Sequence, residues 1–182
     1  MLIEQETVTK VLKILHEEIV PAQGCTEPIA IALVAAKARE VLGEIPEHIK
    51  LFVSGNIIKN VKSVVVPNSG GMVGIETAAA MGIVAGDCKK DLMVISDITE
   101  EDMVAVRKYL EKASFEMIHE KTPVKLYVRI EVSAGEKSAL VEVQYLHTNL
   151  TKVVKNGQVL LDRGFSPESF NTTQEDRSVL SV

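Results

Sequence analysis

The sequence contains no tryptophan, and aromatic residues of all kinds make up only 4% of its 182 positions. The core must therefore be built from aliphatic side chains, and no aromatic platform for stacking nucleic-acid bases is expected. The formal net charge is −5 and there is no long basic run. Neither nucleic acid nor an anionic membrane is therefore an expected partner.

The chain also lacks a long uncharged apolar run, because Lys37 and Arg39 interrupt its most apolar stretch. A short polar lead into an amphipathic segment replaces the basic and apolar regions of a signal peptide, so none is expected. Cysteine is scarce, with Cys25 and Cys88 alone, which is typical of a reducing compartment rather than a disulfide scaffold. These absences predict a cytoplasmic protein.

What is present is globular in composition, with 46% hydrophobic and 25% charged residues. Helical periodicity and end signals predict helices over residues 4–20, 28–42 and 75–85, and another that begins after Thr99. Short β-type runs predict strands at 49–53, 63–66 and 92–95, and alternation predicts four more at 124–132, 139–146, 150–154 and 159–161.

These elements predict an α+β fold, in which apolar helices pack with a small mixed sheet and a C-terminal antiparallel meander. Asn156-Gly157 is a strong signal for a two-residue hairpin within that meander. We expect residues 1–161 to form a single domain. Residues 162–182 are rich in polar residues and are expected to be a tail, or the start of an element that this chain does not complete.

The most informative stretch is Gln23-Gly24-Cys25-Thr26-Glu27-Pro28. Thr26 is expected to be an N-cap and Pro28 a first-turn residue, which would place Cys25 in a cleft at the positive end of a buried helix. That position favours a thiolate, which could attack a substrate or bind a metal ion. Glu27 could be a base, although a first-turn carboxylate more often serves the helix dipole. Cys25 could equally be an inert, buried cysteine.

Three further segments carry candidate binding groups, each with a plainer alternative. The polar side chains between two apolar runs could bind substrate or form an ordinary loop: Ser54, Asn56, Lys59 and Asn60. Ser69 and Gly70 could cradle a carboxylate or simply make a turn. His147 could move a proton beside Asn149, or it could be structural.

Three motifs together resemble one known family: Pro21-Ala22-Gln23-Gly24-Cys25-Thr26-Glu27-Pro28, the segment from Val53 to Asn60, and His147-Thr148-Asn149. The chain resembles the N-terminal half of the L-cysteine desulfidase and L-serine dehydratase alpha-chain superfamily. The resemblance implies elimination of hydrogen sulfide from cysteine, or of water from serine, to give pyruvate and ammonia. It also implies a [4Fe-4S] cluster in the complete enzyme.

The same resemblance assigns Cys25 as a cluster ligand or catalytic thiol, and Ser54, Asn56, Lys59 and Asn60 as the substrate side of the site. His147 joins Cys25 as a candidate catalytic residue, and Ser69, Gly70 and Asn149 as candidate substrate ligands. Two cysteines cannot supply the four thiolates that such clusters usually need. A missing C-terminal half or second subunit is therefore the expected partner, the cluster is not expected on this chain alone, and self-association is plausible.

Two other functions compatible with the sequence belong to different classes. The chain could be a non-catalytic module that binds an amino acid or a partner subunit, with Cys25 incidental. It could also be a metal-free thiol enzyme in which Cys25 is the nucleophile and His147 the base.

Overall fold

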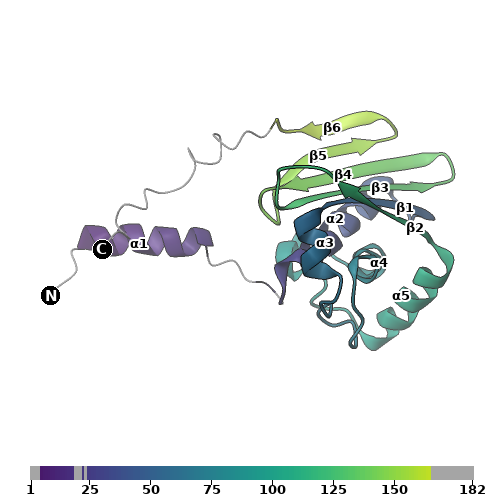
Figure 1. Ribbon diagram of the computed structural model, residues 1–182, viewed down its shortest axis with the longest axis horizontal. Coiled ribbons are helices and arrows are strands. Elements are labelled where there is room, and N and C mark those ends of the chain that lie inside the picture. Colours follow the sequence, from purple (N-terminus) through teal and green to yellow (C-terminus); the bar gives the residue numbers. More distant parts are fainter. Residues whose placement is uncertain (1–4, 19–21, 23, 165–182) are drawn as a thin grey trace. The chain divides into compact units, whose positions relative to one another are not determined.

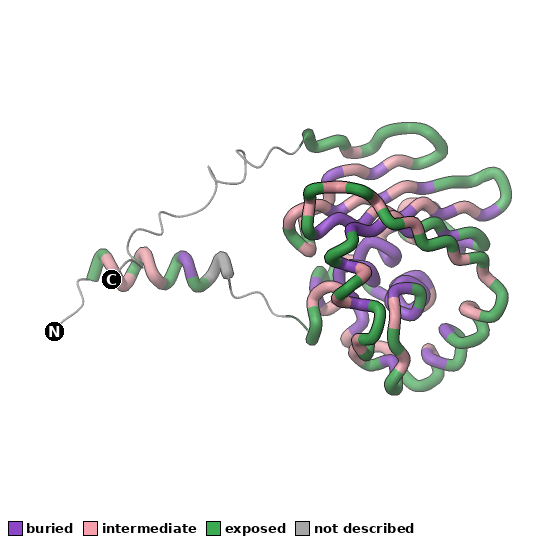
Figure 2. The backbone as a smooth tube through the Cα atoms, viewed as in Figure 1, coloured by how far each residue is buried: buried purple, intermediate pink, exposed green. Residues whose placement is uncertain are grey.

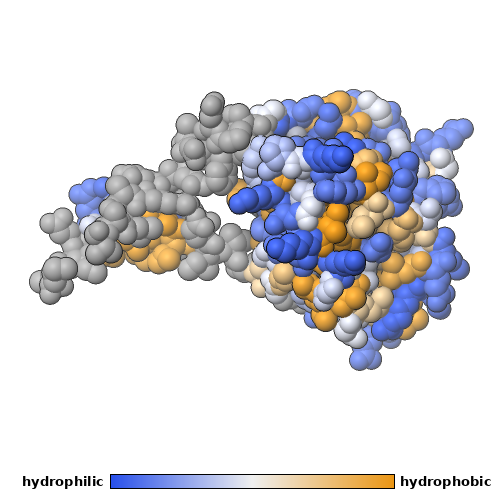
Figure 3. All heavy atoms as spheres, viewed as in Figure 1, coloured by the Kyte–Doolittle hydropathy of each residue, from blue (hydrophilic) through white to orange (hydrophobic). Residues whose placement is uncertain are grey.

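The computed structural model describes residues 5–18, 22 and 24–164. Helix α1, Gln5–Glu18, belongs to one unit and is described by itself, while residues 22–163 form a second, compact unit. Hydrophobic residues gather on one side of α1, as Figure 3 shows. Leu12 and Leu15 of this helix are exposed. The helix predicted over residues 4–20 is thus confirmed in its described part, and the predicted tail lies outside the described residues from residue 165 onward.

The compact unit is built on one six-stranded sheet in the order β2-β1-β3-β4-β5-β6. β1 pairs in parallel with β2, and every other neighbouring pair is antiparallel. The strands are β1 His48–Ser54, β2 Ser114–Glu120, β3 Tyr127–Ala134, β4 Lys137–Gln144, β5 Leu150–Lys155 and β6 Gln158–Asp162. Four consecutive strands, β3 to β6, form the predicted meander, so the α+β class and the mixed sheet are confirmed.

Helices pack on one face of this sheet (Figure 1). They are α2 Thr26–Leu42, α3 Gly55–Val61, α4 Ile75–Ala85 and α5 Glu100–Lys112, with a 3₁₀ helix, η1, at Cys88–Met93. The core lies between the sheet and the helices α2 and α4, which are buried almost throughout (Figure 2). Aliphatic residues and alanine dominate that core, as the scarcity of aromatics requires.

Alanine and glycine allow α2 and α4 to approach very closely. A Cβ placed on Gly82 of α4 would lie 2.1 Å from the backbone oxygen of Ala32 in α2, which is far inside van der Waals contact. Gly43 ends α2 in the left-handed conformation, with φ 90°, as its position predicts. Small residues therefore determine how closely α2 and α4 pack.

Several local predictions were wrong. Residues 63–66 form no strand beyond an isolated bridge between Val65 and Val73, and residues 92–95 belong to η1 and the turn that follows it. β2 was not predicted at all. The capping box at Thr99 is present, with Asp102 as its partner, and the Asn156-Gly157 hairpin turn joins β5 to β6 with positive φ at both residues.

In the part of the chain that the structure describes, no helix combines the length and apolarity needed to cross a membrane. Hydrophilic side chains dominate the visible surface of the compact unit, with smaller apolar areas between them (Figure 3).

Candidate functional site

Cys25 itself occupies the N-cap position of α2, and Thr26 is the first helical residue. The prediction that Thr26 caps the helix was therefore one residue out, and no side chain makes a capping hydrogen bond there. Cys25 is exposed rather than enclosed in a cleft. Gly24 before it has a φ of 156°, and a Cβ at that residue would lie 2.9 Å from Cγ of Pro67, so this approach suits glycine.

Glu27 joins Cys25 to the neighbouring helix α3. The Cys25 thiol donates to Oε2 of Glu27 at 3.2 Å, and the Asn60 side-chain amide donates to Oε1 at 3.1 Å. The two carboxylate oxygens are thus held by two side chains that lie 35 positions apart in the sequence. The sequence argument favoured a helix-dipole role for Glu27 over that of a base, because nothing in the order of residues shows that Asn60 folds onto it.

His147 faces the same carboxylate from the loop between β4 and β5. Burial lowers the pKa of His147, while the charge of Glu27 acts in the opposite direction. Its Nε2 atom is buried and has no hydrogen-bond partner among the described residues. Asn149 stabilises this loop by donating from its side chain to the Gln144 carbonyl oxygen at 3.0 Å. His147 is therefore a neutral imidazole with an unused nitrogen, next to Glu27.

Cys25 is a protonated thiol, whereas a thiolate was expected at a helix start. Partial burial raises the pKa of Cys25, and the hydrogen bond to Glu27 raises it further. Partial burial also acts to raise the pKa of Glu27, but the hydrogen bonds from Cys25 and Asn60 outweigh it and lower that pKa. The carboxylate therefore carries the negative charge, and the thiol keeps its proton.

The polar residues of the segment 54–60 have different roles, and only one of them belongs to the group around Cys25. Ser54 is buried; it donates to the Lys125 carbonyl oxygen at 2.6 Å and accepts from the Ile57 amide as the N-cap of α3. Asn56 and Lys59 are exposed on α3. Among the four predicted residues, only Asn60 contacts the cluster formed by Cys25, Glu27 and His147, which we call the Cys25 cluster.

Ser69 and Gly70 lie elsewhere. Ser69 is fully buried and donates to the Met72 carbonyl oxygen at 2.9 Å, which is the plain turn role. Gly70 is exposed with φ 68° and lines a cleft beside α5, away from the Cys25 cluster. None of the residues that line that cleft belongs to the Cys25 cluster.

The described residues do not fit an iron–sulfur cluster by themselves. No group of three or more His, Cys, Asp or Glu side chains in the described ranges is placed to hold a metal ion. Cys88 hydrogen-bonds to Glu40 in the last turns of α2, and burial together with Glu40 raises its pKa to about 11. Glu40 follows Cys25 by 15 positions, or ~20 Å along a helix, so the two thiols serve different places. Cys25 fits one ligand position at most.

Curated relatives match nearly the whole chain. A UPF0597 protein of Fusobacterium nucleatum is 54% identical over 175 residues, covering 96% of this chain and 41% of the relative. UPF0597 proteins of Treponema denticola and Lachnoclostridium phytofermentans are 41% and 44% identical, and the matches cover 42% and 41% of those proteins. No family model and no solved structure matches. The chain is thus similar to UPF0597 proteins and spans about two-fifths of their length.

Proposed function

We propose that this chain is part of a cytoplasmic, iron–sulfur-dependent amino acid lyase of the L-cysteine desulfidase and L-serine dehydratase type. The observation that supports it best is the Cys25 cluster: an exposed thiol and a neutral imidazole beside one carboxylate at a helix start. Elimination from cysteine or serine needs a group that takes the α-proton and another that handles the proton of the leaving group.

His147 is the proposed proton acceptor, because it is neutral and its Nε2 atom has no partner among the described residues. When that nitrogen takes the α-proton, the electron pair forms the new double bond and the β-thiolate or hydroxide leaves. The aminoacrylate so formed hydrolyses to pyruvate and ammonia. Glu27 stabilises the imidazolium by charge, and it can accept the Cys25 proton whenever that thiol acts as a ligand.

Because one exposed cysteine cannot hold a cluster, the remaining ligands must come from residues outside this chain. The relatives are more than twice as long as the matched segment, which leaves room for them. The proposal is therefore that this chain contributes Cys25, Glu27, Asn60 and His147, and that a second polypeptide region completes the site.

The test is co-expression of this chain with the part of the Fusobacterium nucleatum relative that the match does not cover. The complex is purified without oxygen, and pyruvate is measured with L-cysteine and L-serine. We expect turnover that His147→Gln lowers about 100-fold in kcat, as is typical for loss of a general base. Lys62→Gln, an exposed change at the end of α3, is the matched control and should keep wild-type turnover.

A purified complex that contains iron and sulfide but forms no pyruvate from either amino acid would overturn the lyase proposal and leave the non-catalytic module. If the metal-free thiol mechanism were correct, pyruvate would still form after complete chelation of iron. The raised pKa of Cys25 argues against that mechanism, because a nucleophilic cysteine needs a populated thiolate.

A further inference from the structure

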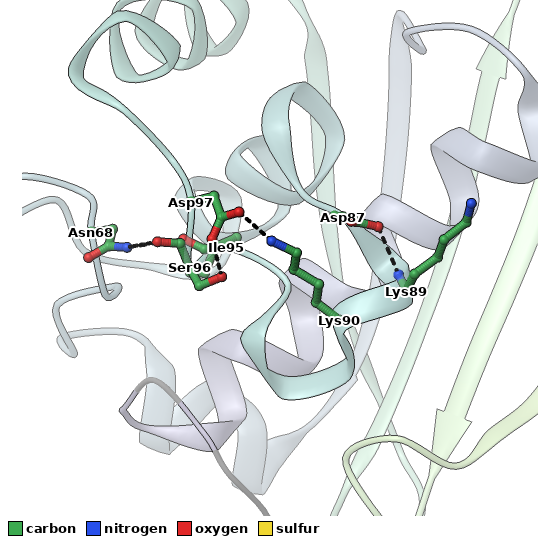
Figure 4. Close-up of polar contacts among 7 residues, drawn as sticks. All are labelled: Asn68, Asp87, Lys89, Lys90, Ile95, Ser96 and Asp97. Atoms are coloured by element: carbon green, nitrogen blue, oxygen red, sulfur yellow. Dashed lines mark hydrogen bonds and ion pairs between the residues drawn. The ribbon is translucent and has the colours of Figure 1, made fainter.

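The cleft beside α5 lies between the turn that carries Gly70 and the first half of that helix. Its volume is about 710 Å³. Asn68 fixes one wall by donating to the carbonyl oxygens of Ile95 and Ser96, each at 3.1 Å, as Figure 4 shows. Ser96 in turn donates to Asp97 at 2.7 Å, and Asp97 pairs with Lys90. The wall opposite α5 is therefore held by several polar contacts.

Two oppositely charged side chains, Glu100 and Arg107, line this cleft but form no ion pair with each other. Arg107 is exposed, and its Nη2 would lie 3.6 Å from a Cβ placed on Gly70, so the guanidinium stands beside the turn. Glu100 lies seven positions earlier on α5 and so points to the same side of the helix. Neither side chain forms an ion pair with another residue of the described ranges.

Apolar side chains separate the two charges. Met103, which is 4% exposed, stands between Glu100 and Arg107 on α5, and Ile98 and Val104 line the cleft around it. Thr99 and Asp102 are occupied by the capping box. The helix start is thus already capped from within the chain, and the unused charges are those of Glu100 and Arg107.

We propose that this cleft binds a small α-amino acid as its zwitterion, with Arg107 holding the carboxylate and Glu100 the ammonium group. A guanidinium matches a carboxylate with two parallel hydrogen bonds, and a carboxylate pairs readily with an ammonium group. The negative charge of Glu100 would repel a simple anion, and the positive charge of Arg107 would repel a simple cation. Only a ligand with both charges satisfies both residues, while its side chain contacts Met103.

This binding site is separate from the Cys25 cluster, so it can be tested on the isolated chain without turnover. The amide resonances of ¹⁵N-labelled protein are followed by NMR during titration with L-serine. We expect saturable shifts for residues of the Gly70 turn and the first half of α5. Arg107→Gln and Glu100→Gln should each weaken binding about tenfold, as expected for loss of a charge-assisted contact.

Lys108→Gln and Glu101→Gln are the matched controls, since these exposed neighbours on α5 do not line the cleft; each should change the Kd by less than about twofold. Acetate and methylammonium, each carrying half of the zwitterion, should bind at least about tenfold more weakly than L-serine. Equal binding of acetate and L-serine would overturn the zwitterion assignment. Absence of saturable shifts, or equal losses in R107Q and K108Q, would overturn the site.

Discussion

Partial burial raises the pKa of Cys25, and its neighbour Glu27 adds to that effect in keeping the side chain a thiol. The carboxylate accepts the hydrogen bond of the thiol and carries the negative charge of the pair, so a second negative charge on sulfur is opposed. This effect acts against the helix dipole, which alone would favour the thiolate. Burial and the nearest charged residue together therefore outweigh the helix end.

Replacing Glu27 with Gln should lower the pKa of Cys25, because the charge and the acceptor that stabilise the thiol are both weakened. The measurement is the rate of Cys25 alkylation by iodoacetamide against pH, read by peptide mass spectrometry so that Cys88 is scored separately. Glu76→Gln, in the first turn of α4, is the control. An unshifted midpoint in E27Q would show that Glu27 does not govern the thiol.

His147 should make the fold less stable on mild acidification. Burial lowers its folded-state pKa below the ordinary value of 6.5, so the unfolded chain binds the proton more readily. Well above pH 6.5, His147 is neutral in both the folded and the unfolded chain and does not change the free energy of unfolding. As the pH falls below 6.5, the unfolded chain takes up the proton first, and the free energy of unfolding decreases. When the pH is lowered from 7.5 to 5.5, the midpoint of urea denaturation should therefore decrease less in His147→Gln than in the wild type. His119→Gln, at an exposed histidine, should fall as wild type does.

Sequence reasoning named Cys25, Glu27, Asn60 and His147 as candidates but not the contacts that join them. Glu27 looks like any first-turn acid until α3 folds against α2 and brings Asn60 to it. Ser54 and Ser69 were predicted to bind substrate, yet both hydroxyls donate to backbone carbonyls in buried positions. A polar side chain satisfied by the backbone and one facing a ligand look alike in a sequence.

At the scale of elements, the contact between α2 and α4 requires a glycine. In an open helix, Gly→Ala stabilises by roughly 0.5–1 kcal/mol. At Gly82 the added Cβ would collide with the Ala32 backbone, so the sign should reverse and the free energy of unfolding should fall by at least ~3 kcal/mol.

Urea denaturation measures this change. Gly135→Ala is the matched control, because a Cβ there meets nothing within 4 Å and only its φ of 53° opposes the substitution. It should cost roughly 1–2 kcal/mol. Stabilisation by Gly82→Ala would mean that the two helices do not meet at this point.

The elements that sequence patterns predicted well are those with a complete local signal. The start of α5 has its capping box, β3 to β5 alternate between buried and partly exposed residues, and a hairpin signal lies between β5 and β6. β2 has no such signal, since it is an edge strand whose residues are exposed or half-buried. The 92–95 run is apolar because Leu92, Val94 and Ile95 enter the core, where a 3₁₀ segment and turn bury side chains as well as a strand does. In the 63–66 run only Val66 is buried, and Val65 is exposed.

At the scale of the whole molecule, the hydrophobic core of the compact unit is drawn from residues 29–153. A variant that begins at Ala22 keeps every residue of that core, and we expect it to fold with a Tm within about 3 °C of the full chain. Circular dichroism on heating measures this. A loss of the cooperative transition would show that residues 1–21 are needed for the fold. The comparison also gives the smallest chain for studies of the Cys25 cluster.

The position of β1 between β2 and β3 has a consequence for how the protein is made. β1 ends at Ser54, but its parallel neighbour begins only at Ser114 and its antiparallel neighbour at Tyr127. At ~5–20 residues per second, a ribosome needs roughly 3–15 s to synthesise the interval. Once α4 is complete at Ala85, α2 and α4 are available to pack together, while β1 still has no strand to pair with. The helical layer should therefore form first and serve as the surface on which the sheet is later assembled.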